Sequence, residues 1–598
     1  MPFLGSKTHA KNNEIHLKVD DNVIKDQSKV AETFVDFFAT IADGIGGNDV
    51  DFLSETDFEN HPSVQRIAQH AQYSHDKYLT LQPLNEAQVQ GALESLNVAK
   101  ATGYDSIPPS IMKIGASEIA GSLTALYNNC ISKGKWPQLW KKGEWTPVFK
   151  REDPLMKENY RPITVLPAVD KVFEQLIAKQ VNGMFDNRLG QCITAYRKTY
   201  SCESALINLI EHWKLAKDNK QLIGILSTDM SKAFDSLHPA LLLSKLKAYG
   251  FHDAFIDLMR DYLCDRPNRV KLGSNSSSWR RVNRGCPQGS ALGPLLWNIF
   301  QNDLCYEISQ NLSMYADDHQ IYEVGDNILE VNSNLNLKAE KASQWYESNL
   351  LKGNLSKYQT MAIGNTHGGD EICVNVKGYD IETLSSLKLL GVTIDNKLNF
   401  SEHITTACKK ASQRTGVLLR LKNLVPTSAK LQLFKGAILP YLTYCHLTWH
   451  FCRASDCRKL ERIQERALRA VFRDKKSTYQ QLLKRAELTT LLERRLQDIA
   501  LLMFKVKHGL YPKNVRDLFT VNTSRYNLRG SDFTVPRFNS VTYGKHSLRY
   551  LGPKLWKLLP EELRNTPSIQ TFKKQIRRVE IKPLLTDGCR NRCPLCND

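Results

Sequence analysis

The chain has 598 residues, of which 81 are Lys or Arg and 62 are Asp or Glu, so its formal net charge at pH 7 is +19. This length exceeds what one hydrophobic core usually serves and predicts roughly three or four domains. Hydrophobic residues at 42% and charged residues at 24% exclude a chain that is largely disordered, collagen-like or coiled coil.

The positive charge is concentrated at the C-terminal end. Residues 401–598 contain 39 Lys and Arg against 15 Asp and Glu, whereas residues 1–400 contain 42 against 47. A near-neutral body joined to a strongly basic last third is typical of a protein that binds a polyanion, and nucleic acid is the favoured partner. A merely solvated surface or an anionic membrane is the alternative, although a membrane face would need amphipathic anchors flanked by Trp and Phe.

The N-terminus lacks the apolar stretch of a secretory signal, and no window reaches the length of a membrane span. The 14 cysteines are scattered, and a chain of this size needs no disulfides, which favours a reducing compartment. We therefore expect an intracellular protein without membrane association.

Residues 1–80 are polar apart from one amphipathic segment. Apolar residues recur there on one helical face, before the breaker Gly44. The members of this face are Val30, Phe34, Phe37, Phe38 and Ile41. We expect a helix here, in an extension that docks on a larger body.

The hydrophobic period changes at residue 221. Residues 83–220 are predicted to be mainly helical with short loops. The apolar run 222–226 predicts a strand that ends at Thr228–Asp229. Residues 237–249 then have a helical pattern that stops at Gly250.

Two later segments are predicted to be hairpins. Residues 312–324 would turn at Asp317–Asp318, and residues 387–400 would turn at Asp395–Asn396. Beyond residue 401 the pattern returns to basic helices. The fold class predicted from these patterns is α+β in the middle of the chain, with helical flanks.

Three carboxylates lie on the ends and turns of predicted strands. They are Asp229, Asp317 and Asp318. Hard cations such as Mg²⁺ take oxygen ligands, and a pair of such ions stabilises both the attacking and the leaving oxygen in phosphoryl transfer. An Asp-Asp pair at a turn is, however, more often turn chemistry alone. Sequence spacing cannot show that Asp229 and Asp317 meet in space.

The blocks around these carboxylates resemble the palm of a reverse transcriptase of the non-LTR (LINE-type, jockey-like) retrotransposon family. The resemblance runs from about residue 80 to 400, continues more weakly through the basic tail, and rests on several blocks in the family's order. They are KATGYDSIP at 100–108, NYRPI at 159–163, SKAFD at 231–235, GCPQGS at 285–290, YADD at 315–318, NLSK at 354–357 and LLGV at 389–392.

The resemblance implies a right-hand polymerase with fingers, palm and thumb and a basic helical C-terminal domain. The expected domains are an N-terminal extension (1–80), fingers (81–220), a palm interleaved with fingers elements (221–400), a thumb (401–480) and the basic C-terminal domain (481–598). The family's N-terminal endonuclease is expected to be missing, because residues 1–80 are too few to form it.

By this resemblance, Asp229, Asp317 and Asp318 would bind two Mg²⁺ ions that activate a primer 3′-hydroxyl and neutralise the pyrophosphate leaving group. Lys357 matches a residue suggested to protonate pyrophosphate. The hairpin 387–400 would grip the primer end.

Five further residues match the family's nucleotide-binding positions. They are Lys150, Arg161, Phe234, Gln288 and Gly289. Lys150 and Arg161 would clamp the triphosphate, since the planar fork of Arg pairs with phosphate in a bidentate way. Phe234 would lie under the sugar and exclude a 2′-hydroxyl. Gln288 and Gly289 would lie beneath the templating base pair. The alternatives are surface charges for the two cations and a core position for Phe234.

The basic tail contains a helix with two stripes, predicted over residues 458–473. Its apolar stripe consists of Leu460, Ile463, Ala467 and Val471, and its basic stripe consists of Arg462, Arg466, Arg469 and Arg473. Such a helix would pack on one face and contact a nucleic-acid backbone with the other. The alternative is a solvated face with ion pairs to Glu461 and Glu465.

Two groups of cysteines have spacings that raise the question of a metal site. Cys589, Cys593 and Cys596 have spacings that could begin a zinc site, but no fourth ligand follows, so bound zinc is the less favoured interpretation. The second group consists of Cys445, His446, His450, Cys452 and Cys457. It lies among aromatic residues, and packing on a buried helix is favoured for it.

The resemblance implies an RNA-directed DNA polymerase that extends a primer with deoxynucleotides, in target-primed reverse transcription. Its partners would be an RNA template, a DNA primer or nicked target DNA, and deoxynucleoside triphosphates, which favours the nucleus. An RNA-dependent RNA polymerase is an alternative, because Asp229 and Asp235 also fit such enzymes, but Phe234 argues against it. A catalytically inactive remnant that only binds nucleic acid is the alternative from another class.

Overall fold

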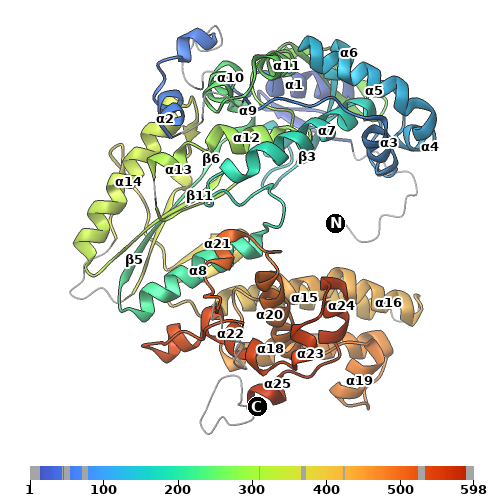
Figure 1. The fold of residues 1–598 in the computed structure, drawn as a ribbon. Coiled ribbons are helices and arrows are strands. Elements are labelled where there is room, and N and C mark those ends of the chain that lie inside the picture. The colour runs from blue at the N-terminus through green and yellow to red at the C-terminus, as the bar shows by residue number, and fades with distance from the viewer. Residues whose placement is uncertain are drawn as a thin grey trace. The chain divides into compact units, whose positions relative to one another are not determined.

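The structure is a computed structural model, and it describes residues 14–43, 45, 54–70, 78–308, 310–364, 372–421, 424–522 and 532–586. It is 53% helix and 14% strand, which confirms the predicted mixture of helix and sheet (Figure 1). The chain forms two compact units, each made of three separate stretches. Unit 1 comprises residues 1–196, 229–310 and 340–354, and unit 2 comprises residues 197–228, 311–339 and 355–598.

In unit 1, the N-terminal segment docks through helix α1 (Gln27–Ala39) and the hairpin β1 (Leu17–Val19) and β2 (Asn22–Ile24). The helix begins where the Asp26 side chain accepts hydrogen bonds from two backbone N–H groups. Phe34 and Phe38 are buried against Trp145 of the larger body. The predicted helix and its docking are confirmed, while Gly44 lies outside the described residues.

Unit 1 contains a five-stranded sheet that the sequence reading missed in part. Its order is β4-β3-β7-β8, with β9 also paired to β7, and only β3 and β7 are parallel. The strands are β3 (Gly143–Phe149), β4 (Tyr160–Val165), β7 (Arg266–Leu272), β8 (Asn275–Ser276) and β9 (Arg280–Val282). β3 and β4 lie in the segment predicted to be mainly helical. Pro147 and Pro162 face each other in this pair, and proline within a run argues against a strand.

The rest of unit 1 is mainly helical. They are α2 (Pro62–His70), α3 (Glu86–Glu94), α4 (Pro109–Ile114), α5 (Ala116–Lys133), α6 (Gln138–Lys141), α7 (Ala168–Phe185), α9 (Ala233–Ser236), α10 (Pro239–Ala248), α11 (Asp253–Leu263), α12 (Gly293–Gln301) and α13 (Leu304–Glu307). Short strands β6 (Met230–Ser231) and β12 (Lys352–Gly353) pair with each other. The helix predicted over 237–249 is confirmed as α10, and Gly250 follows it with φ +85°.

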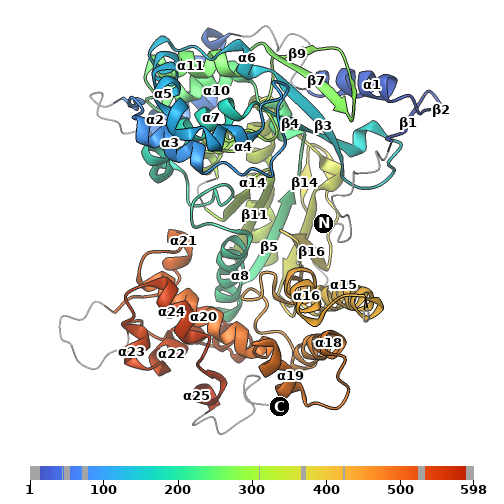
Figure 2. The same cartoon turned by 90° about the vertical axis from the view of Figure 1, so that its right-hand side faces the viewer.

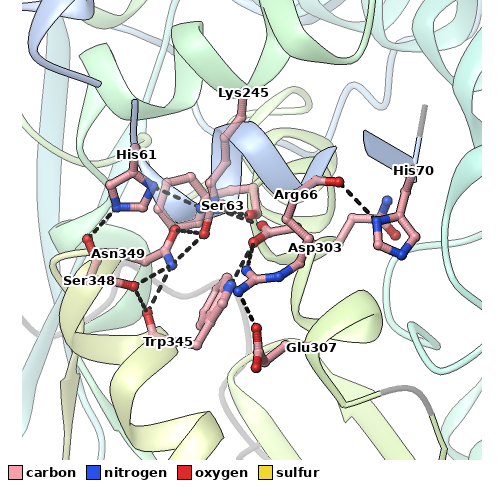
Figure 3. A network of polar contacts seen from close by, with 12 residues as sticks. His61, Ser63, Arg66, His70, Lys245, Asp303, Glu307, Trp345, Ser348 and Asn349 are labelled. Carbon is pink, nitrogen blue, oxygen red and sulfur yellow. Dashed lines mark hydrogen bonds and ion pairs between the residues drawn. The ribbon is translucent and has the colours of Figure 1, made fainter. Parts of the chain in front are cut away.

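A buried polar network ties α2 to the rest of unit 1 (Figure 3). The Asp303 side chain is fully buried and accepts hydrogen bonds from Lys245 Nζ at 2.7 Å and from Trp345 Nε1 at 2.7 Å. From α2, Arg66 lies 3.5 Å from the same carboxylate and also pairs with Glu307. Each charge of such a buried pair needs the other for its stabilisation, because water cannot solvate either of them.

Two cysteines of unit 1, Cys192 and Cys305, form a disulfide. This disulfide contradicts the expectation that a chain of this size with scattered cysteines has none, on which the reducing compartment was based. Spacing alone cannot reveal a pair that is 113 residues apart. Nine other cysteines of the described part of the chain are free thiols.

Unit 2 is built on an antiparallel sheet of order β10-β11-β5-β13 (Figure 2). Its strands are β5 (Leu222–Thr228), β10 (Leu312–Tyr315), β11 (Asp318–Gly325) and β13 (Gln359–Ile363). Helix α8 (Cys202–Asp218) contacts one face, where Trp213 meets Tyr322 edge-on. Helix α14 (Ile328–Ser348) contributes Val331 and Leu335 to the other face, so close that a Cβ on Gly224 would lie 2.7 Å from Val331 Cγ1. The predicted strand 222–226 is confirmed.

Both predicted hairpins exist, but the first turns at Ala316–Asp317, one residue earlier than predicted, and the second turns at another place. β16 (Ser386–Leu389) and β17 (Val392–Asp395) are joined by Leu390 and Gly391, and not by Asp395–Asn396. Gly391 has φ +84°, a conformation that glycine adopts readily. A further short hairpin consists of β14 (Asn375–Val376) and β15 (Tyr379–Asp380).

Beyond residue 401 unit 2 is helical, as predicted. Its helices are α15 (Ser401–Arg420), α16 (Thr427–Leu433), α17 (Leu439–Thr443), α18 (Ala454–Phe472), α19 (Tyr479–Ala486), α20 (Leu491–Lys507), α21 (Lys513–Arg516), α22 (Leu548–Leu558), α23 (Glu561–Arg564), α24 (Ile569–Ile576) and α25 (Lys582–Thr586). A core cluster joins the sheet to α15–α19, and a second one joins α20 to α22 and α24. Within the described segments, no helix is both long and apolar enough to cross a membrane.

Candidate active site

Three of the site residues predicted from the sequence, Asp317, Asp318 and Lys357, lie at one end of the unit 2 sheet. β10 ends at Tyr315 opposite Asp318, the first residue of β11, so Asp317 lies in the turn between these strands. Lys357 lies two residues before β13, whose first residue pairs with Ser227 near the end of β5. The chain continues from Thr228, the last residue of β5, directly into Asp229.

The turn that carries the carboxylates is strained and partly open to solvent. Ala316 has φ +58°, which costs a non-glycine residue on the order of 1 kcal/mol. Asp317 is half-buried and Asp318 is exposed, whereas the next residue, His319, is fully buried. Burial lowers the pKa of His319 to about 3. The imidazole is therefore neutral at pH 7 and adds no positive charge beside the turn.

The donor atoms at this end of the sheet fit a hard divalent cation. Mg²⁺ prefers oxygen ligands and is usually held by one or two carboxylates together with substrate phosphates. Asp317 and Asp318 supply such oxygens on one turn. Among the residues that the structure describes, no group of three or more His, Cys, Asp or Glu side chains is arranged to hold a metal ion.

In unit 1, the loop at 285–289 contacts both the segment after β6 and strand β4. Gly285 has φ +76°, and a Cβ there would lie 2.8 Å from the backbone of Asp235. The Cys286 N–H donates to the Phe234 carbonyl at 3.0 Å, and the Thr164 N–H donates to the Gln288 carbonyl at 2.7 Å. These contacts place the SKAFD and GCPQGS blocks side by side.

Gly289 lies where this loop meets β4. Its φ is +122°, and a Cβ there would lie 2.7 Å from the Thr164 carbonyl oxygen. A side chain is excluded both by the backbone conformation and by the close approach. The requirement for glycine at this position thus has a structural cause, independent of any role beneath a base pair.

A contact between Asp235 and Gln288 was missed by the sequence reading. Gln288 Nε2 donates to both carboxylate oxygens of Asp235, at 2.9 and 2.8 Å. Burial raises the pKa of Asp235 to about 6, although Gln288 and the charges of Lys232 and Arg161 act in the opposite direction. The two residues are 53 positions apart, and no local sequence pattern predicts the contact.

The raised pKa of Asp235 predicts a pH-dependent effect of Asp235→Asn. The folded-state pKa lies above the ordinary value of 3.8, so the ionised carboxylate costs stability that is fully felt above about pH 6 and fades as the pH falls toward 4. Asparagine keeps an acceptor for Gln288 and removes this charge. We expect the variant to be more stable than the wild type at pH 8, by at most about 3 kcal/mol because part of the residue is exposed.

Thermal unfolding of both proteins between pH 4.5 and 8.5 measures this difference. The stability gain should shrink as the pH falls through 6. Asp253→Asn, an exposed carboxylate of α11, is the control and should show no such trend. A variant that is less stable than the wild type at pH 8 would contradict the prediction.

Phe234 is half-buried between two aromatic residues of unit 1. It stacks on Trp297 with 5.3 Å between ring centroids, and Tyr196 meets it edge-on at 6.2 Å. Packing against Trp297 fixes the plane of the ring, so the two interpretations drawn from the sequence are compatible. One face belongs to the core, and the residue keeps partial exposure.

Lys150 and Arg161 belong to the β3–β4 hairpin. Arg161 is opposite Val148, and the Lys150 N–H donates to the Asn159 carbonyl at 2.9 Å, so both side chains follow the same face of the hairpin. Both residues are exposed. The hairpin thus supplies two cations in reach of one polyanionic ligand.

The predicted two-stripe helix is α18. Leu460, Ala467 and Val471 are buried, and Ile463 is partly buried. Arg462, Arg466 and Arg473 are exposed. Arg469 differs from the predicted stripe, because it is half-buried and pairs with Glu465 at 2.7 Å, as in the alternative interpretation. Glu461 instead accepts hydrogen bonds from Tyr479 and from the Leu492 N–H.

The two cysteine groups have different outcomes. Cys589, Cys593 and Cys596 lie outside the described residues. In the second group, Cys445, His446, His450 and Cys452 are buried and Cys457 is partly buried, as expected. The segment from residue 444 to 450 is a turn rather than the expected helix.

Comparison with known proteins gives matches over much of the chain. Residues 141–394 match the family model described as reverse transcriptase (RNA-dependent DNA polymerase). The chain is 27% identical over 408 residues to the probable RNA-directed DNA polymerase from transposon BS of Drosophila melanogaster, which covers 66% of this chain and 45% of that protein. It is 25% identical over 410 residues to the RNA-directed DNA polymerase from mobile element jockey of the same organism, covering 66% and 44%.

A more distant match is the retrovirus-related Pol polyprotein from type-1 retrotransposable element R1 of Bradysia coprophila. It is 24% identical over 373 residues, which covers 60% of this chain and 37% of that protein. The chain spans less than half the length of these curated relatives.

Proposed function

We propose that this chain, which carries a reverse transcriptase domain of the non-LTR retrotransposon type, is an RNA-directed DNA polymerase. It would extend a primer 3′-hydroxyl with deoxynucleotides on an RNA template, and the primer would be the 3′-end at a nick in the target DNA. The observation that carries the proposal is the match of residues 141–394, which contain the Asp317–Asp318 turn at the end of the unit 2 sheet.

The proposed chemistry is two-metal phosphoryl transfer. Reverse transcriptases use a divalent metal, and here Asp317 and Asp318, joined by Asp229, would hold two Mg²⁺ ions. The metals would supply charge stabilisation at the attacking and leaving oxygens. The role of the chain is then to position substrate, with Lys150 and Arg161 toward the triphosphate and Lys357 as a proton donor to pyrophosphate. The distal cysteines Cys589, Cys593 and Cys596 form no part of this proposal.

Primer extension tests the proposal directly. The full chain is incubated with an RNA template, an annealed DNA primer, Mg²⁺ and deoxynucleotides, and extension to the template end is the expected result. Efficient extension with ribonucleotides alone would instead favour an RNA polymerase. Nucleic-acid binding without extension under any divalent metal would leave a catalytically inactive remnant.

The aromatic packing of Phe234 predicts a change in sugar selectivity for Phe234→Ala. If the ring excludes a 2′-hydroxyl, its removal opens that space, and a discrimination of this kind is worth on the order of 1–3 kcal/mol. We expect ribonucleotide incorporation, relative to deoxynucleotide, to rise about 10- to 100-fold. Single-nucleotide extension with competing dNTP and rNTP measures the ratio. An unchanged ratio in a folded variant would assign Phe234 to the core alone.

We further propose that unit 1 holds the fingers and part of the palm and that α15–α18 belong to a thumb. The basic face of α18 would follow the backbone of the template–primer duplex without reading its bases. Exposed Arg462, Arg466 and Arg473 support this assignment. Since the substrates are nucleic acids of the genome, we propose the nucleus as the place of action.

Exposure along α18 predicts which arginines contribute to duplex binding. Arg462→Gln combined with Arg466→Gln should lower the slope of log K against log salt by about 2 and weaken binding roughly equally for all sequences. Arg469→Gln is the matched control on the same helix, because its guanidinium is already paired with Glu465. Fluorescence anisotropy from 50 to 300 mM salt measures both. Equal losses in the double variant and the control would contradict the assignment.

A further inference from the structure

A pair of thiols in unit 2 has a chemical environment that the polymerase chemistry does not use. Cys452 lies just before α18, and Cys457 lies in the first turn of that helix. Their sulfur atoms are 3.4 Å apart, within hydrogen-bond distance. One thiol can therefore donate to the other, which stabilises the acceptor as a thiolate.

A buried cation is directed at the same sulfur. Arg495 of α20 is 1% exposed, and its Nη2 donates to Cys457 Sγ at 3.2 Å. Its Nε and Nη1 have no hydrogen-bond partner among the described residues. A guanidinium with this little solvent requires a negative partner, and a Cys457 thiolate supplies one.

The pKa values of the two thiols are shifted in opposite directions. The hydrogen bond from Cys452, together with Arg495, lowers the pKa of Cys457 below its ordinary value. The same hydrogen bond, together with burial, raises the pKa of Cys452. One sulfur is thus prepared as the nucleophile and the other stays a thiol, an asymmetry typical of redox-active dithiols.

Cys457 is partly exposed, whereas Cys452 is buried. Both line a cavity of about 800 Å³ in unit 2, whose walls include Arg458 and Lys484. This space exceeds the size of a tripeptide, and its lining carries both acidic side chains (Glu461, Glu493, Glu580) and basic ones (Arg458, Lys484, Lys582). An acidic low-molecular-weight disulfide therefore has room to approach Cys457.

We propose that Cys452 and Cys457 form a redox-active dithiol that low-molecular-weight disulfides such as glutathione disulfide oxidise to an intramolecular disulfide. The Cys457 thiolate attacks one sulfur of glutathione disulfide, a mixed disulfide forms, and one glutathione thiolate leaves. Cys452 then loses its proton to solvent and attacks the Cys457 sulfur, releasing the second glutathione. The dithiol gives up two electrons, and one glutathione disulfide becomes two glutathione molecules.

Oxidation has a structural consequence for α18. The disulfide removes the negative partner of Arg495 and leaves a buried guanidinium without compensation. It also requires the sulfurs to approach from 3.4 Å to about 2.05 Å at the start of the helix that carries the exposed arginines. The redox state of this pair therefore bears on the packing of α18 against α20.

Peptide mapping of the full chain tests the proposal without reference to polymerase activity. Trypsin cleaves after Arg453, between the two cysteines, so oxidation links peptide 436–453 to peptide 454–458. We expect the linked pair after treatment with glutathione disulfide, and its loss after dithiothreitol. Cys452→Ser should instead accumulate a Cys457–glutathione mixed disulfide, and Cys457→Ser should form neither product.

A rate measurement separates this chemistry from simple exposure. Alkylation of Cys457 by iodoacetamide should rise with a midpoint below that of an ordinary thiol, and exposed Cys373 serves as the internal comparison. Cys452→Ala removes the donor and should move the Cys457 midpoint upward, while Cys452→Ser, which retains a hydroxyl donor, should move it less. Faster alkylation of Cys373 than of Cys457 at pH 6.5, or no linked peptide after oxidation, would overturn the proposal.

Discussion

Replacing Asp317 by asparagine is expected to lower primer extension by about 10³-fold or more while leaving the fold intact. The side chain lies in the turn between β10 and β11, where an amide of the same size can be accommodated. It removes one negative charge from the oxygens that would hold Mg²⁺, and such ions supply several kcal/mol of charge stabilisation in the transition state. Each 1.36 kcal/mol lost corresponds to a tenfold lower rate.

The same strand offers a matched control for this variant. Asp326 is exposed, immediately follows β11 at the end away from Asp318, and accepts a hydrogen bond from Gln221. Asp326→Asn retains that acceptor and should extend primers at the wild-type rate. Rates are compared at saturating primer–template and nucleotide, with thermal unfolding recorded for all three proteins. Full activity of the Asp317 variant would remove this turn from the chemistry.

The sequence predicted the carboxylate end of the sheet because its signals are local. An apolar run leads into Asp229, and a turn dipeptide between two apolar strands contains Asp317. The strand pairing in unit 2 confirms the hairpin, with the turn one residue earlier than expected, at Ala316–Asp317. Alternation and turn residues suffice where the strand and its turn are neighbours in the chain.

The hairpin at 386–395 shows how local signals mislead. Asp395–Asn396 is a stronger turn dipeptide than Leu390–Gly391 on residue preference alone. In the structure, the Asp395 carboxylate accepts hydrogen bonds from the N–H groups of Lys397, Asn399 and Phe400. Its turn chemistry is thus used to lead the chain from β17 into α15.

Contacts across long sequence separations were beyond prediction. Gln288 and Asp235 meet only because Gly285 allows its loop to pass over the Asp235 backbone. Likewise, the sequence favours mere packing for Cys452 and Cys457, because their chemistry depends on Arg495, which is 38 residues from Cys457. Residue types indicate which side chains could take part in such sites, whereas the tertiary structure decides which of them contact one another.

Replacing Asp303 by asparagine is expected to have the largest effect on stability and little effect on chemistry. Its carboxylate is the buried partner of Lys245, and breaking such a pair costs about 3–5 kcal/mol because a charge remains without compensation. For a unit of about 290 residues, that loss lowers the unfolding temperature by roughly 5–8 °C. Asp36→Asn breaks an exposed pair with Arg280 in the same unit and should cost less than about 1 kcal/mol.

The pH dependence identifies the cause of that loss. Burial lowers the pKa of Lys245 to about 8, while Asp303 opposes this shift. Without Asp303 the folded-state pKa falls further below its ordinary value, so the folded variant binds fewer protons than the unfolded chain over a wider range. Its stability therefore rises with pH, and the gap to the wild type should narrow between about pH 6 and 8.

A second substitution completes the test of this network. Lys245→Met added to Asp303→Asn removes both charges, and it should recover most of the lost stability, since replacing a buried ion pair by apolar groups is often neutral. Thermal unfolding at several pH values measures all variants. A single Asp303 variant as stable as the double one would contradict the pairing. Primer extension below the unfolding temperature should persist in both variants, because the network holds α2 to α10 and α14 and contains none of the residues proposed to bind metal or nucleotide. We thus expect Asp317 variants to lose rate and keep stability, and Asp303 variants to do the reverse.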